Sequence, residues 1–241
     1  MARLVTSSSR SRRLLVLAVA AAAAALMLVV PSTEHADAAD AHAHTTSQQS
    51  GSSRTAPVAI RTAAQLQFHD QMRKLWEDHV TWTRLAIVSF VGGNEQDFSA
   101  TAARLMANQD DIGNAIKPFY GDAAGDQLTT LLKEHISIAV EILQAAKDND
   151  GSAVQSASDR WYANSDEIAD FLAAANPNLS QDQMRAMMRK HLDDTLSEAV
   201  NQLTGNFAAG VTDYDAIHDH ILMMSDTISD AIMKEFPRRF R

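Results

Sequence analysis

The spacing of apolar residues from about residue 62 onward constrains the fold more than any other feature of this chain. Apolar side chains recur three and four positions apart, as on one face of an α-helix, and no stretch alternates like a β-strand. Glycine, proline and asparagine interrupt the pattern at intervals. The breaks predict six helices, over about residues 62–91, 95–116, 122–147, 153–175, 181–204 and 212–236. The expected fold class is therefore all-α.

Three histidines occupy the same place in this helical pattern, 56 residues apart. They are His79, His135 and His191, and each lies within an apolar stripe. Residues 79–134 align without a gap with residues 135–190, and the identical pairs include Asn108 with Asn164. We interpret the chain as three helical hairpins related by a 56-residue repeat. Such hairpins would close into an antiparallel six-helix bundle with approximate threefold symmetry.

A second polar residue recurs with the histidines. Asn108 and Asn164 follow their histidines by 29 residues, and in the third unit the residue at this distance is His220. Each interval contains one hairpin loop near its midpoint, so both of its ends should lie level in the bundle. The apolar stripe of the last helix also permits a four-residue insertion, which would put Met224 in place of His220. Both assignments remain open.

This inward polar layer has two main interpretations. The first is a transition-metal site, zinc or copper, because neutral imidazoles are common ligands for both ions. The ring nitrogens left over would be held by the asparagines, and Met224 instead of His220 would favour copper. The candidate metal-site residues are His79, His135, His191, His220, Asn108 and Asn164.

The second interpretation is a hydrogen-bonded structural layer without metal, in an interaction or scaffold module. Each unmade hydrogen bond of a buried imidazole costs roughly 1–3 kcal/mol, which favours the metal slightly. A metal-dependent enzyme is a third alternative. It needs an open coordination position and a cleft, and the sequence indicates neither. We expect a metal-binding protein for storage, sensing or delivery.

The first 60 residues do not resemble the rest. Residues 1–38 combine a basic start, an apolar run over residues 14–30 and a small-x-small motif at 36–38, which predicts an export signal. Arg12-Arg13 also resembles a twin-arginine signal, and a retained membrane anchor is the alternative. Residues 39–60 predict a disordered linker, 61–237 the helical domain and 238–241 a basic tail. The expected location is outside the cell or in its envelope.

Charge and composition exclude several classes of function. The formal net charge is −9; the four arginines and two acids of residues 1–38 sum to +2, so the remainder carries −11. A domain this acidic is a poor candidate for binding nucleic acid or an anionic membrane. The chain has no cysteine, which excludes disulfides and thiolate metal ligands. We expect a monomer that does not contact the membrane once its signal is cleaved.

Three segments resemble a family of uncharacterised small bacterial helical proteins. They are residues 75–84 (LWEDHVTWTR), 117–122 (KPFYGD) and 161–168 (WYANSDEI). The resemblance extends over about residues 70–237 and implies one helical domain. Some members of that family are labelled glycosyltransferase, although the present sequence has no motif or strand pattern of a nucleotide-sugar enzyme.

Overall fold

The computed structural model describes residues 62–241, and this part of the chain contains six α-helices and no strand. The predicted all-α bundle is therefore confirmed, whereas the 56-residue repeat stays a prediction. The predicted signal (1–38) and linker (39–60) lie outside the described residues. The elements are α2 (Ala63–Gly92), α3 (Glu95–Tyr120), α4 (Asp122–Lys147), α5 (Gly151–Ala175), α6 (Gln181–Thr204), α7 (Phe207–Glu235) and the short 3₁₀ helix η1 (Pro237–Phe240).

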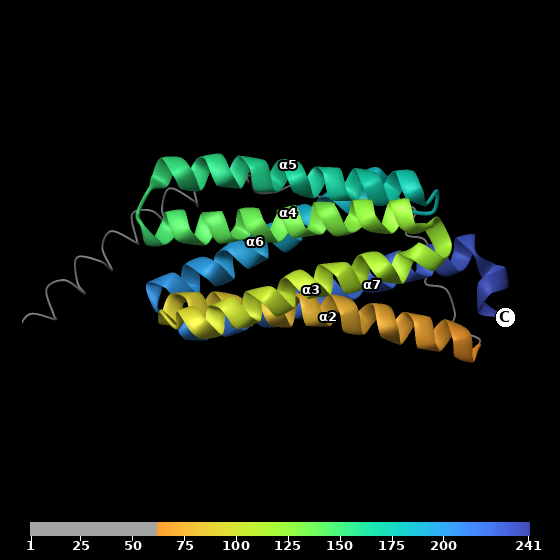
Figure 1. Ribbon diagram of the computed structural model, residues 1–241, viewed down its shortest axis with the longest axis horizontal. Coiled ribbons are helices and arrows are strands. Elements are labelled where there is room, and N and C mark those ends of the chain that lie inside the picture. The colour runs from red at the N-terminus through yellow and green to blue at the C-terminus, as the bar shows by residue number, and fades with distance from the viewer. Residues whose placement is uncertain (1–61) are drawn as a thin grey trace, which may run out of the picture.

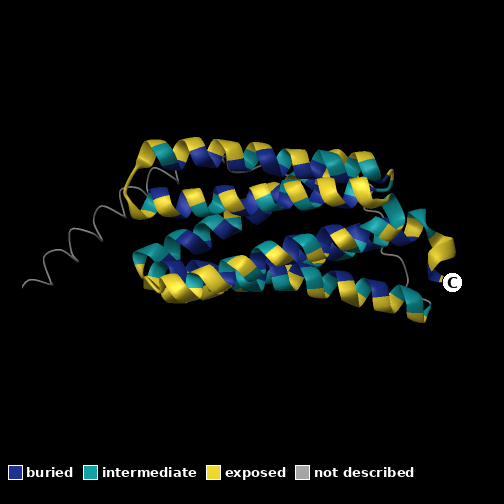
Figure 2. Ribbon diagram, viewed as in Figure 1, coloured by how far each residue is buried: buried dark blue, intermediate teal, exposed yellow. Residues whose placement is uncertain are grey.

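The six helices close into a ring. Each helix packs against the next one in the chain, and α7 returns to pack against α2. In Figure 1, α4 and α5 run along one side of the molecule, and α2, α3 and α7 along the other. Buried residues face the interior of this ring, and exposed residues cover its outside (Figure 2). No helix within residues 62–241 has the length and apolar character needed to cross a lipid bilayer.

Local signals in the sequence explain where the helices begin and end. Thr62 and Gln65 form a capping box at the start of α2, and Ser180 caps α6 through the backbone N–H of Gln183. Helices α2 and α6 both end at a glycine in the left-handed conformation, with φ of 72° at Gly93 and 81° at Gly205. Glycine adopts this conformation without a steric penalty, so these two breaks were readable from the sequence.

Helix α3 is longer than predicted. The expected end near Ile116 was wrong, because the helix continues through Pro118 to Tyr120. Proline removes one backbone hydrogen bond, which is tolerated here in the last turn of the helix. The extra turn is held by tertiary contacts: the Tyr120 hydroxyl donates to Glu235 Oε2 at 2.9 Å, and Phe119 packs on Phe240 with ring centroids 5.4 Å apart. These contacts outweigh the local preference.

Helix α7 begins earlier than predicted, at Phe207 instead of near Thr212. Its first turn exposes both Phe207 and Val211, so it presents no inward apolar stripe that could have revealed it. This turn is nevertheless anchored to the bundle, because Arg84 Nη1 donates to the Gly210 carbonyl at 3.0 Å.

Candidate functional site

The structure brings His79, His135 and His191 together in the centre of the bundle. They project from α2, α4 and α6, and their exposed fractions are only 3–4%. The ring centroids of His79 and His191 are 5.7 Å apart, and those of His135 and His191 are 6.5 Å apart. Three imidazoles that are distant in the sequence therefore converge in one layer, here called the His layer.

Burial keeps these imidazoles neutral. Desolvation lowers the pKa of His79 to about 4, although a hydrogen bond from Gln109 opposes the shift. Desolvation, reinforced by the neighbouring His79, lowers the pKa of His135 to about 3. The pKa of His191 is lowered well below its ordinary value by desolvation and by the proximity of His79, His135 and His220. Neutral imidazole is the form that binds a metal ion or accepts a hydrogen bond.

His135 is held by the asparagine of its own hairpin. Its Nδ1 lies 3.0 Å from Asn164 Oδ1, so Nδ1 carries the proton and Nε2 keeps its lone pair. Asn164 Nδ2 in turn donates to the Leu131 carbonyl at 3.2 Å. Trp161 stacks on the imidazole with ring centroids 5.0 Å apart. This contact is the one expected from the 29-residue spacing.

His79 has a different partner from the one expected. The prediction that Asn108 would hydrogen-bond to His79 was wrong: Gln109 Nε2 lies 3.3 Å from His79 Nδ1, and Asn108 Nδ2 donates to the Leu75 carbonyl at 3.0 Å. Because the amide N–H donates, His79 Nδ1 is the acceptor and its proton resides on Nε2. The tautomer is thus the reverse of that of His135. The amide oxygen of Gln109 is buried without a partner.

His220, not Met224, takes the corresponding position in the third hairpin. Its Nε2 donates to the Met187 carbonyl at 2.9 Å, across 33 residues of sequence. The bonds from Asn108 to Leu75 and from Asn164 to Leu131 also span 33 residues. The side chain of His220 therefore replaces an asparagine in its backbone contact.

His191 is the least satisfied member of the layer. Its Nδ1 is buried and has no hydrogen-bond partner. Within residues 62–241, no group of three or more histidines or carboxylates is arranged to hold a metal ion. Three imidazoles around one tetrahedral ion at the usual 2.0–2.1 Å would have ring centroids about 5 Å apart. The His layer is thus wider than a closed metal site by about 1 Å.

A buried ion pair near the layer was missed by the sequence analysis. Glu198 on α6 is 1% exposed and accepts a hydrogen bond from Arg84 on α2. Burial raises the pKa of Glu198 to about 7, and Arg84 opposes this shift. Arg84 also lies over the Tyr214 ring, 5.0 Å from its centroid. Only the fold brings these two charges together, because 114 residues separate them.

Comparison of the chain with models of protein families, with curated proteins and with solved structures finds no match. The resemblance to a family of uncharacterised helical proteins therefore stays a prediction, and the function must be argued from the His layer itself.

Proposed function

We propose that the bundle binds one transition-metal ion, zinc or copper, through His79, His135 and His191. The observation that carries this proposal is the convergence of three neutral imidazoles from three helices, with centroid separations of 5.7 and 6.5 Å. The contact of Asn164 with His135 Nδ1 supports it, because outer hydrogen bonds of this kind orient metal-binding histidines. The biological role would be metal storage, sensing or delivery by an exported protein.

Metal binding would require two local adjustments. The rings must approach one another by about 1 Å to reach the Zn–N distance of 2.0–2.1 Å. His79 must also move its proton to Nδ1 if it is to bind through Nε2, and Gln109 must then turn its unpartnered amide oxygen toward that nitrogen. The rotation would give up the present bond from Gln109 Nε2 to the Leu105 carbonyl at 2.8 Å.

The second candidate is a structural layer without metal. It is favoured by the hydrogen bonds that His79, His135 and His220 already make, and by the spacing of the rings. In this role the histidines would set the register of α2, α4 and α6, and the chain would act through its surface. A metal-dependent enzyme has no specific observation in its favour.

The test is elemental analysis of the purified, untagged full chain, combined with thermal unfolding in zinc or copper and in a chelator. We expect one ion per chain and a rise in the melting temperature. Ligand at a hundred times its Kd stabilises a folded protein by about 2.7 kcal/mol. His191→Leu should abolish both effects, whereas His218→Gln, which changes a half-buried histidine outside the layer, should preserve them.

Two results would overturn the metal proposal. One is the absence of bound metal together with unchanged unfolding in metal and in chelator. The other is equal metal binding by wild type and His191→Leu, which would place the ion elsewhere in the chain. Either result would leave the structural layer as the function of these histidines.

A further inference from the structure

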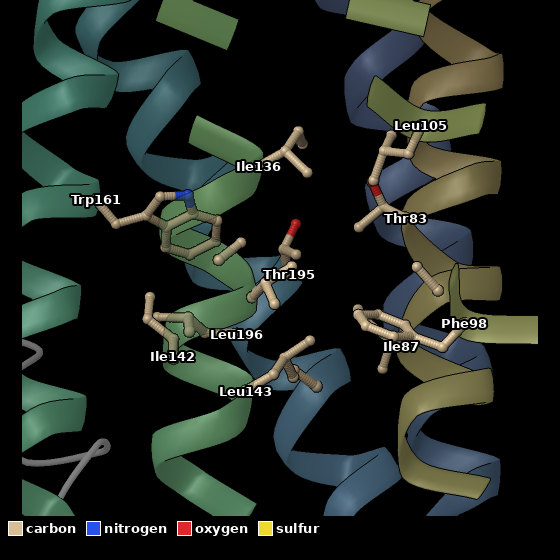
Figure 3. Close-up of a pocket in the computed structure, with 14 residues that line it drawn as sticks. Thr83, Ile87, Phe98, Leu105, Ile136, Ile142, Leu143, Trp161, Thr195 and Leu196 are labelled. Atoms are coloured by element: carbon tan, nitrogen blue, oxygen red, sulfur yellow. The ribbon is translucent and has the colours of Figure 1, made fainter. Parts of the chain in front are cut away.

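A cavity of about 50 Å³ lies in the core beside the His layer. In Figure 3, side chains from α4, α5 and α6 face those from α2 and α3 across this space. Its nearest links to the layer are Thr83, Thr195 and Trp161, which contact the backbone of the three histidines. Other lining residues are Ile87, Phe98, Leu105, Ile136, Leu143 and Leu196.

Small residues at two positions explain why the core is not filled here. Ile87, Leu143 and Ala199 are spaced 56 residues apart on α2, α4 and α6, and all three line the cavity. Two of them are large and the third has only a methyl group. Ala139 stands in the same relation to Thr83 and Thr195. A protein core normally packs to crystal-like density, so two such truncations in adjacent layers leave a void.

The walls have no polar group available for water. The hydroxyls of Thr83 and Thr195 each donate to a carbonyl four residues earlier, those of His79 and His191, both at 2.7 Å. The indole N–H of Trp161 donates to the His135 carbonyl at 3.0 Å. A buried water needs two to four polar partners, and apolar cavities without them stay dry. The space therefore suits an apolar guest better than water.

We propose that this cavity binds an uncharged, apolar molecule of a few heavy atoms, such as a dissolved gas or a short alkyl chain. Its volume of about 50 Å³ exceeds the share of one water in the liquid, ~30 Å³. It is smaller than the ~150 Å³ apolar cavity that accommodates benzene. The proposal does not depend on a metal ion, because the walls of the cavity contain no histidine side chain.

Xenon is a suitable probe, since it is apolar, uncharged and small. We would titrate the metal-free full chain with xenon and follow the ¹²⁹Xe NMR chemical shift. Wild type should show a saturable shift. Ala199→Val puts two more carbons into the cavity and should weaken xenon binding roughly tenfold, the equivalent of 1.4 kcal/mol. Ala186→Val is the matched control, because it changes an exposed alanine on the same helix.

The outcomes separate cleanly. A non-saturable shift in wild type would overturn the proposal, as would equal xenon binding by wild type and Ala199→Val. If Ala199→Val does not fold, Ala139→Val fills the same cavity from α4 and decides between the outcomes. Metal analysis plays no part in this experiment, so its result is independent of the metal proposal.

Discussion

The buried neutral histidines should make the bundle sensitive to acid, and His135 allows the effect to be isolated. Its pKa is about 3 in the folded chain, against 6.5 for the model value that applies when the chain unfolds. Between these values the unfolded state binds a proton that the folded state does not. The stabilising contribution is therefore complete above pH 6.5 and is lost as the pH falls toward 3.

The size of the effect follows from the same two values. Each pKa unit corresponds to 1.36 kcal/mol, so protonation of the unfolded His135 should cost the fold about 2 kcal/mol between pH 7 and pH 5. His135→Gln removes this titration and keeps an amide that can hydrogen-bond to Asn164. The variant should therefore lose about 2 kcal/mol less stability than wild type over this interval, whatever its stability at pH 7.

The assay is urea unfolding of both proteins in chelator at pH 7, 6 and 5. Comparison with wild type cancels the titration of other groups, including Glu198, whose raised pKa acts in the opposite direction. Leu132→Ala serves as the control, because it destabilises the same helix without a titrating group and should do so equally at each pH. Identical pH slopes for wild type and His135→Gln would refute the claim that His135 is neutral in the folded protein.

Two further predictions concern packing and charge. A Cβ at Gly113 would lie 2.6 Å from the Gly125 carbonyl oxygen, so Gly113→Ala should destabilise the α3–α4 contact by roughly 1–3 kcal/mol in urea unfolding. Gly151→Ala, at an open site, should cost nothing and would contradict this reasoning if it were equally harmful. Arg84→Met leaves Glu198 buried without its partner and should cost about 3–5 kcal/mol at pH 8, where the acid is ionised. The loss should shrink at pH 5 and largely disappear in the double variant Arg84→Met/Glu198→Leu; equal unfolding curves at both pH values would contradict it.

Local periodicity and breaking residues were sufficient to predict the number of helices and most of their ends. Helix caps and left-handed glycines act within a few residues, so sequence neighbours carry the signal. Pro118 shows the limit of this reasoning. The local preference for ending α3 was overridden by Phe119 and Tyr120, whose partners lie more than 100 residues away in the chain.

The inward position of the three histidines could also be predicted, since equal spacing along regular helices places them at one height. Their detailed contacts could not. Asn108 and Gln109 differ by about 100° around the helix axis, and apolar periodicity does not resolve which amide meets the imidazole of His79. Small rotations of packed helices decide this, and they depend on every contact in the bundle.

The sequence by itself determined an all-α bundle and a layer of histidines inside it, because helical period and spacing are properties of the chain. The tertiary structure alone decided the ring separations, the tautomers, the Arg84–Glu198 pair and the cavity beside Ala199. Each of these depends on ångström-scale distances between helices. Such distances result from the packing of all six helices together, and no local pattern encodes them.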